Sequence, residues 1–538
     1  MVRKMSVAVS AAWVVGVAVA AASDAPPPIR SVQIGPRCEL RVNGRPFIPL
    51  MSWLQEPKRY PKLKSLGFNA FCGNHEVPAV RMCEAAKAAG GYAIPHFDKA
   101  AAGHTNLLAW IHGDEPDLPK RVSDAKITPG KGLRLNPKTP LYRIVDGTTT
   151  SWSVLDPLAG AEITIHLEAP ATIHAVAIWP TVSKGLSVAR DVVLLGDGRK
   201  VLEARLEPKR MIQKFRLPQP AKLERLTFRV VSVHKGENEW GSIGEIHAYD
   251  AAGKNVLLAR PRQVPRKTPE QLAREYQAIK GVDRTRPIFV TFTAYFMRKG
   301  SRYGEEDRRS LYPAYVKSTD VVGFDIYPIY GWNRPDWLYR VAEGVSELRR
   351  LAGPTRPVYA WIETSKGSQW ITYDRQKDVL PRHTRSEVWM AIIRGATAIG
   401  YFTHAWRPTF TEFRPTPRMQ EELKRLNGQV TRLAPAILGE PAGGSVGIEA
   451  AGGATCHVKA TRHGGWLYVF AQNIDMKGRA GQATVHVGGL KAGAKVEVVD
   501  ERRALTAGAE KFDDRFDVLQ EHVYRIPDGS IGAGREGR

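Results

Sequence analysis

The sequence predicts an α/β protein built on a (β/α)8 TIM barrel, with one β-sandwich inserted into the barrel and a C-terminal β-sandwich after it. Eight short apolar runs of strand character lie between residues 47 and 404, and helical stretches separate most of them. This rhythm is interrupted once, between residues 119 and 265, and it ends after residue 434. No nucleotide-binding glycine motif follows any of the runs, which disfavours an open doubly wound sheet.

The first half of the barrel is expected in front of the interruption. A helix at residues 61–66 follows the first strand, and an alanine-rich helix at residues 80–89 follows the second. Such alternation gives parallel strands joined by crossover helices. The four strands expected here are residues 47–54, 68–73, 92–97 and 107–112.

The second half is expected after the interruption. It opens with a helix at residues 269–280, for which Thr268 is a suitable N-cap. Further helices are expected at residues 337–351 and 384–396, and a last one at residues 418–434 completes the barrel. The four strands expected in this half are residues 287–293, 320–327, 358–363 and 398–404.

Two stretches of the chain show β-type runs without helical periodicity. The first predicts an inserted β-sandwich over residues 119–265, which divides the barrel into residues 31–118 and 266–436. The second, after the last helix, predicts a C-terminal β-sandwich with a flexible Gly-rich tail over residues 437–538.

The N-terminus is typical of a signal peptide. A basic start is followed by an apolar run over residues 7–22 and by small residues suited to cleavage near residues 20–25. An uncleaved membrane anchor is the alternative, but the run is shorter than the ~20 apolar residues that a spanning helix needs. We therefore predict a signal peptide over residues 1–23 and a secreted protein, extracellular or periplasmic, without a membrane span.

The chain has 78 Lys and Arg residues against 54 Asp and Glu residues, a formal net charge of +24. This surplus favours acidic partners, so an acidic glycan, uronic or sulfated, is one interpretation, and a generally basic composition of the source is the other. Nucleic acid is disfavoured as a partner by the predicted export and by the acidic rim described below. The four cysteines show no CxxC spacing, so neither a metal site nor a cofactor is predicted, and nothing specifies an oligomeric state.

The residues that end the strands are the informative ones, because a (β/α)8 barrel carries its active site there. Glu115 ends the fourth strand within Gly-Asp-Glu-Pro, and Glu363 ends the seventh within Trp-Ile-Glu-Thr. Glycoside cleavage requires such paired carboxylates, since one protonates the leaving oxygen and the other attacks the anomeric carbon or activates water. The other candidates, for substrate binding, are Asn74, His96, Asp114, Asp325, Tyr327, His404 and Trp406.

This arrangement resembles that of the clan A glycoside hydrolases, retaining (β/α)8 enzymes with an acid/base glutamate after strand four and a nucleophilic glutamate after strand seven. The resemblance covers residues 47–434 apart from the interruption, and it implies Glu115 as acid/base and Glu363 as nucleophile. It also implies Tyr327 as a hydrogen-bond donor to the nucleophile, Trp406 as a platform under the sugar, and Asn74 and His96 as hydrogen-bond partners of sugar hydroxyl groups.

Asp114 departs from the clan A pattern, which has Asn before the acid/base. Gly-Asp-Glu at the end of strand four is also similar to family-20 hexosaminidases, in which Asp orients the substrate's own N-acetyl group and Glu is the acid. Purely structural roles are a further alternative: Glu115 as a helix cap and Glu363 in a salt bridge. A barrel that has lost activity would leave a carbohydrate-binding protein.

The inserted domain resembles the discoidin-like domains of coagulation factor 5/8 type C. The matching segments are Val-Asp-Gly-Thr-Thr-Thr-Ser-Trp at residues 145–152, the run at 163–167, Asp197 with Gly198, and the closing run at 243–249. The resemblance implies binding of sugars, or in some members membranes, through loops at one end, and the alternative is a domain that only braces the barrel. Together these patterns predict a secreted retaining β-glycosidase that hydrolyses a poly- or oligosaccharide by double displacement.

Overall fold

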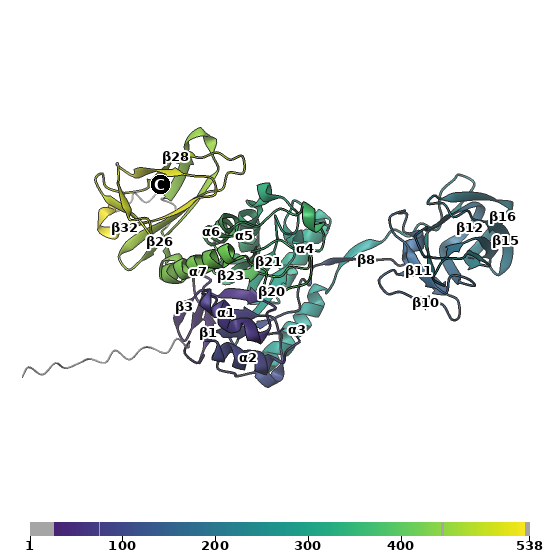
Figure 1. The fold of residues 1–538 in the computed structure, drawn as a ribbon, viewed down its shortest axis with the longest axis horizontal. Helices are drawn as coiled ribbons and strands as arrows, with labels where there is room; N and C mark the ends of the chain where they lie inside the picture. The colour runs from purple at the N-terminus through teal and green to yellow at the C-terminus, as the bar shows by residue number, and fades with distance from the viewer. Residues whose placement is uncertain (1–25, 75, 443–445, 533–538) are drawn as a thin grey trace, which may run out of the picture. The chain divides into compact units, whose positions relative to one another are not determined.

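The computed structural model describes residues 26–74, 76–442 and 446–532. The predicted signal peptide lies outside these residues. The chain forms two compact units, one made of Met1–Leu118 and Arg266–Arg538 and the other of Pro119–Pro265 (Figure 1). No helix in the described part of the chain is long and apolar enough to cross a membrane.

Eight parallel strands form the barrel of the first unit. Seven sheet pairings join them in the order β6, β5, β4, β23, β22, β21, β20, β7. Parallel bridges from Ala93 to Leu107 and from His96 to Ile111 join β6 to β7 and close the circle, which confirms the predicted barrel. The strands are β4 (Leu50–Trp53), β5 (Ala70–Cys72), β6 (Tyr92–Ile94), β7 (Trp110–Ile111), β20 (Ile288–Phe292), β21 (Val321–Asp325), β22 (Val358–Glu363) and β23 (Ala398–Phe402).

Seven α-helices belong to the described part of this unit. Thr268 caps α3 through a capping box with Gln271, as the sequence predicts. No helix is predicted from the sequence at α4, because its first turn is charged and the buried residues in its first half are limited to Arg308. The helices are α1 (Tyr60–Ser65), α2 (Ala79–Ala88), α3 (Pro269–Val282), α4 (Glu305–Val316), α5 (Arg340–Ala352), α6 (Pro381–Ile393) and α7 (Pro417–Ile437).

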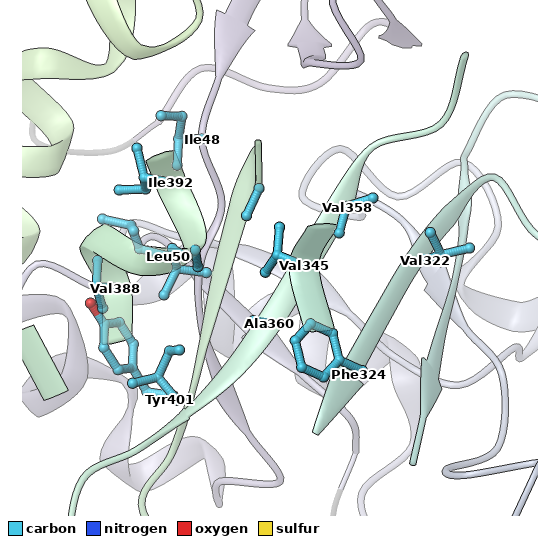
Figure 2. Close-up of a cluster of buried hydrophobic side chains, with 14 of the residues drawn as sticks. Ile48, Leu50, Val322, Phe324, Val345, Val358, Ala360, Val388, Ile392 and Tyr401 are labelled. Atoms are coloured by element: carbon cyan, nitrogen blue, oxygen red, sulfur yellow. The ribbon is translucent and has the colours of Figure 1, made fainter. Parts of the chain in front are cut away.

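Side chains alternate along each strand between the outside and the inside of the barrel. The outward residues of β21 and β22 are Val322, Phe324, Val358 and Ala360, and they pack in one buried cluster with side chains of α5 and α6 (Figure 2). This layer holds the helices on the strands, so that the strand ends meet at one rim.

The inside of the barrel is filled by aromatic rings rather than left as a pore. Trp361 donates its indole N–H to Thr291 Oγ1 at 3.1 Å, and the Tyr359 hydroxyl lies 2.8 Å from the same oxygen. A Cβ atom on Gly323 would come within 2.1 Å of the Tyr359 ring, and one on Gly400 within 2.1 Å of the Trp361 ring. The two glycines are therefore required by the bulk of the rings that face them.

A small antiparallel sheet precedes the barrel. Its Val32, Leu40 and Val42 side chains belong to the same buried cluster as inner-face residues of the barrel, among them Met51 and Phe289. This segment was predicted only as the start of the barrel, without strands of its own. The strands are β1 (Val32–Ile34), β2 (Leu40–Val42) and β3 (Arg45–Phe47).

The second unit is an antiparallel β structure with its own hydrophobic core. Residues 161–167 and 174–180 are two separate apolar runs in the sequence, but they form one strand, because pairing with β16 continues across two register shifts. The strands of this unit are β8 (Pro119–Val122), β9 (Ile127–Pro129), β10 (Arg134–Leu135), β11 (Ser153–Asp156), β12 (Glu162–Pro180), β13 (Val188–Ala189), β14 (Asp191–Gly196), β15 (Arg199–Arg205), β16 (Gln213–Val230), β17 (Val233–His234), β18 (Gly241–Tyr249) and β19 (Arg262–Pro265).

The C-terminal part of the first unit consists of two antiparallel sheets around a separate core. It is tied to the barrel through Arg385 of α6, which donates hydrogen bonds to Glu521 at 2.5 Å, Gln429 at 2.5 Å and Glu422 at 3.1 Å. The strands are β24 (Glu440–Pro441), β25 (Val446–Ala450), β26 (Cys456–His463), β27 (Trp466–Asn473), β28 (Gly481–Val487), β29 (Lys495–Val498), β30 (Arg503–Thr506), β31 (Lys511–Phe516) and β32 (Glu521–Pro527).

Candidate active site

Glu115 lies in a tight turn directly after β7. Its backbone has φ 47°, in the left-handed region that glutamate rarely adopts. The Arg266 guanidinium lies 3.5 Å from its carboxylate and donates a hydrogen bond to the carbonyl oxygen of Asp114 at 2.8 Å. Non-glycine residues held in this conformation are concentrated at functional sites, where the surrounding structure holds them in place.

Asp325, the last residue of β21, is hydrogen-bonded to the Glu115 side chain. Its Oδ1 atom is buried and has no hydrogen-bond partner among the described residues. Because a carboxylate has no proton to donate, a hydrogen bond between two carboxyl groups requires that one of them is protonated. The pair therefore shares a proton at the C-terminal ends of β7 and β21.

Several acidic side chains lie close together in this site, and they affect one another's pKa values. Burial, followed by the Glu115 and Asp114 charges, raises the pKa of Asp325 well above its ordinary value. Burial also raises the pKa of Glu115, but the Arg266 charge opposes this shift. Desolvation at the rim, followed by the charge of Glu115, raises the pKa of Asp114 to about 7. These environments favour the protonated form of Asp325 more strongly than that of Glu115, because only Glu115 has the Arg266 charge to oppose the effect of burial.

Asp117 anchors the turn that carries Glu115. Its buried carboxylate accepts hydrogen bonds from the Thr293 N–H at 2.9 Å, from the Thr293 hydroxyl at 2.7 Å and from the Tyr312 hydroxyl at 2.7 Å. Burial raises the pKa of Asp117 to about 7 against the effect of these donors. The sequence analysis missed this residue, although its place two positions after Glu115 in Gly-Asp-Glu-Pro-Asp was a usable signal.

Glu363 is the last residue of β22, the strand next to β21, and it has contacts of its own. It is fully buried, and its carboxylate accepts hydrogen bonds from the backbone N–H groups of Ile329 at 2.9 Å and Tyr330 at 2.6 Å. The carboxyl group of Glu387 of α6 interacts with that of Glu363, and both Glu387 oxygens are buried. Burial raises the pKa of Glu363 to about 7 and that of Glu387 well above its ordinary value. The structure thus joins Glu115 to Asp325, and Glu363 to Glu387.

Tyr327 lies beside the carboxyl pair. Burial, followed by the Asp325 and Asp114 charges, raises its pKa well above the ordinary value. Its ring lies 4.7 Å from that of Phe402, centroid to centroid. The predicted hydrogen bond from Tyr327 to Glu363 is not formed between these two described residues.

Trp406 and His404 extend the site along the loop after β23. Trp406 is 38% exposed and stacks on Phe402 with a centroid distance of 6.0 Å and an interplanar angle of 5°. His404 is buried, with Nε2 3.2 Å from the carbonyl oxygen of Leu54, and its ring lies 6.0 Å from that of Phe410. Tyr327, Phe402 and Trp406 therefore belong to one aromatic cluster.

A hydrogen bond joins Asn74 and His96, which follow the ends of β5 and β6. Asn74 Oδ1 accepts a hydrogen bond from the backbone N–H of His96 at 2.9 Å, and Asn74 Nδ2 donates one to the carbonyl oxygen of Val77 at 2.9 Å. His96 Nδ1 lies 3.2 Å from the carbonyl oxygen of Ile111, and burial lowers the pKa of this ring. Both polar atoms of the Asn74 side-chain amide are thus hydrogen-bonded to the backbone of the protein.

Within the described residues, no group of three or more His, Cys, Asp or Glu side chains is arranged to hold a metal ion. The chemistry that the site offers on its own is that of carboxyl groups. Burial raises the pKa of both Glu115 and Asp325, and the Arg266 charge opposes this shift at Glu115.

Comparisons with known proteins return distant structural likenesses. The chain matches no protein-family model, and no curated protein is similar to it in sequence. The family 32 carbohydrate-binding module of NanJ from Clostridium perfringens, in complex with galactose, is similar over 24% of this chain and 98% of its own, with 13% identity and a TM-score of 0.21.

Two other solved structures show likenesses of the same order. The family 32 carbohydrate-binding module of EndoD from Streptococcus pneumoniae matches over 24% of this chain and 99% of its own, with 18% identity and a TM-score of 0.21. An α-amylase from Geobacillus thermoleovorans, complexed with acarbose, matches over 48% of this chain and 57% of its own, with 12% identity and a TM-score of 0.33.

Proposed function

We propose that this protein is a glycoside hydrolase acting on a poly- or oligosaccharide. The observation that carries the proposal is the hydrogen-bonded pair of Glu115 and Asp325 at the C-terminal ends of two barrel strands, beside the ring of Tyr327. Two carboxyl groups that differ in protonation are what the cleavage of a glycosidic bond requires.

The reaction we propose is double displacement. One carboxyl group of the pair protonates the glycosidic oxygen while the other, ionised, bonds to the anomeric carbon. Water then breaks the glycosyl-enzyme bond, and it returns a proton to the first group.

Two other assignments stay open as predictions. The sequence hypothesis names Glu363 as nucleophile, and the substrate-assisted alternative gives Asp114 the task of orienting an N-acetyl group. In the substrate-assisted scheme hydrolysis is restricted to N-acetyl sugars and depends strongly on Asp114. We favour the pair of Glu115 and Asp325 because these two side chains are in contact, whereas both carboxylate oxygens of Glu363 are engaged by backbone N–H groups.

The proposal is tested by incubating the protein with aryl β-glycosides, among them galactosides, glucosides, mannosides, glucuronides and N-acetylglucosaminides, and with soluble polysaccharides. Proton NMR of the first product identifies its anomeric configuration. We expect hydrolysis with retained configuration. An inverted first product would contradict double displacement, and absence of hydrolysis across both sets would contradict the enzyme assignment.

Replacing Arg266 by glutamine is expected to move the pH dependence of kcat/KM upward. The Arg266 charge lowers the pKa of Glu115, so its removal favours the protonated form and raises that pKa. The Arg266→Lys variant, which keeps the charge, is the control and should show a smaller shift. Rate profiles of both variants between pH 4 and 9 give the measurement, and a downward shift in Arg266→Gln would contradict the assignment.

The inserted unit offers a second surface for glycans. A hollow of about 480 Å³ contains Trp152, which is 45% exposed, and Tyr142, whose hydroxyl group donates a hydrogen bond to the carbonyl oxygen of Arg121 at 3.0 Å. Four cations without an ion pair among the described residues line it: Lys120, Arg121, Lys138 and Arg143. We propose that this hollow binds an acidic glycan, since a ring face and unpaired cations suit a uronic or sulfated sugar.

Replacing Trp152 by alanine is expected to weaken retention of the full chain on gels containing alginate or chondroitin sulfate. Loss of one stacking ring should cost about fivefold in apparent affinity, equivalent to ~1 kcal/mol. Trp240, 36% exposed in the same unit and outside the hollow, supplies the control variant Trp240→Ala. Equal retention of both variants and the parent would contradict the proposed site.

A further inference from the structure

Two aromatic side chains beyond the carboxyl pair are strongly exposed on the rim of the barrel. Trp370, in the loop after β22, is 66% exposed, and Phe410, in the loop after β23, is 53% exposed. Exposed large apolar groups cost free energy in water unless a ligand covers them, so a connected group of them indicates a binding surface.

The two residues are the ends of a series of neighbouring aromatic rings. Ring centroids are separated by 6.3 Å from Trp370 to Tyr330, 5.2 Å from Tyr330 to Phe402, 6.0 Å from Phe402 to Trp406, and 5.5 Å from Trp406 to Phe410. Tyr327 joins the series at Phe402. We call these five rings, from Trp370 to Phe410, the rim aromatic surface; Trp370, Trp406 and Phe410 are its exposed members, and Tyr330 and Phe402 are buried.

The loop that carries Trp370 is held by a buried amide. Gln376 Oε1 accepts hydrogen bonds from the backbone N–H groups of Gly367 at 2.8 Å and Ser368 at 3.0 Å, and its Nε2 donates to the carbonyl oxygens of Ser368 at 2.8 Å and Ile371 at 2.7 Å. Four hydrogen bonds from one buried side chain fix the backbone on both sides of Trp370. The ring is thus presented before any ligand binds, which lowers the entropy cost of binding.

Backbone hydrogen bonds join the same loop to the loop that carries Trp406 and Phe410. The carbonyl oxygen of Gly367 accepts hydrogen bonds from the backbone N–H groups of Trp406 at 2.7 Å and Arg407 at 3.0 Å. A Cβ atom at residue 367 would lie 2.3 Å from that of Ala405, and the backbone there has φ 131°, so only glycine permits this approach. The two loops therefore present their rings as one preorganised surface.

We infer that the rim aromatic surface binds sugar units adjacent to the cleaved bond, and that the substrate is accordingly a glycan chain rather than a single sugar on a small aglycone. This inference rests on the proposed function of the same site. The apolar faces of pyranose rings stack on aromatic side chains while their hydroxyl edges stay in water.

The test measures binding without requiring hydrolysis. In a Glu115→Gln background, retention is compared on gels containing hydroxyethylcellulose, galactomannan, arabinogalactan or alginate. Trp370→Ala and Phe410→Leu are each expected to weaken retention about fivefold, as loss of one stacking ring does. Trp370→Phe and Phe410→Tyr, which keep a ring face, should restore most of it. Val282→Ala at the end of α3, also an exposed apolar residue, is the control and should leave retention unchanged.

In the active protein, Trp370→Ala should raise KM for the retained polysaccharide about fivefold, whereas Val282→Ala should leave it unchanged. Unchanged retention of Trp370→Ala and Phe410→Leu, or retention of none of the four polysaccharides by the parent, would overturn the inference even if aryl glycosides are hydrolysed. Ring-dependent retention without hydrolysis of any substrate would instead overturn the proposed function and support the binding surface.

Discussion

Replacing Glu115 by alanine is expected to lower kcat/KM on the preferred glycan by a factor of about 10²–10⁴, the usual contribution of a positioned acid or base. The same loss is expected for Asp325→Ala, because each group needs the other as its proton partner. Initial rates with both variants, in parallel with circular dichroism to confirm folding, give the measurement. Activity within tenfold of the parent in either variant would contradict the assignment.

Azide distinguishes the roles of the carboxyl groups. In a retaining enzyme that lacks its nucleophile, azide attacks the substrate directly and yields a glycosyl azide of inverted configuration. In one that lacks its acid/base, azide intercepts the glycosyl-enzyme and yields the retained configuration. We expect a glycosyl azide of one anomeric configuration from Asp325→Ala and of the opposite configuration from Glu115→Ala. Since protonation is favoured more strongly at Asp325 than at Glu115, the inverted product is expected from Glu115→Ala.

Glu363→Ala provides the comparison with the sequence hypothesis. If Glu363 were the nucleophile, this variant would be inactive and azide would restore activity with an inverted product. The backbone contacts of Glu363 predict instead that the variant is less stable and that azide does not change its rate. Rescue of Glu363→Ala by azide would return the nucleophile to Glu363.

The second large effect concerns stability and pH at the buried pair of Glu363 and Glu387. Both pKa values are raised, so the folded protein holds a proton that the unfolded chain loses above pH ~4.5. The free energy of unfolding should therefore fall as the pH rises above ~4.5, through the pKa of Glu363 at about 7, and it should keep falling until Glu387 also loses its proton. Glu387→Gln, which cannot titrate, should reduce this fall to the part that the burial of Glu363 alone causes.

We expect Glu387→Gln to be more stable than the parent by an amount on the order of 2 kcal/mol at pH 8, and equal to it at pH 4.5. Urea unfolding at both pH values gives the measurement. Glu421→Gln, on the exposed face of α7, is the control and should match the parent at both. A difference that is the same at pH 4.5 and pH 8 would contradict the shared proton.

Glu363→Gln should behave differently from Glu387→Gln. A glutamine has one acceptor oxygen, so its NH₂ group would face one of the two backbone N–H groups that the Glu363 carboxylate accepts. The unsatisfied buried donor is expected to cost about 1–3 kcal/mol at every pH. Because those N–H groups belong to Ile329 and Tyr330, the rim aromatic surface should also lose order, visible as weaker glycan retention.

The barrel could be predicted because each of its strands is a short apolar run that must be buried on both faces. The segment 358–363 illustrates this, since its six residues form β22 without a shift at either end. The helix α4 could not be predicted in the same way, because its start is charged and its burial depends on contacts with other elements. The pairing that joins residues 161–167 and 174–180 in one strand could not be predicted, because a register shift has no local signal.

For the site, the sequence by itself determined which strand ends carry acids: Asp114, Glu115, Asp325 and Glu363 all follow apolar runs. Only the tertiary structure decided which acids meet. The left-handed turn at Glu115 brings its carboxylate to Asp325, while the carboxylate of Glu363 contacts two backbone N–H groups and Glu387. Sequence spacing fixes the position of a residue along a strand, but the direction of a side chain at a strand end depends on loops that only the folded chain brings together.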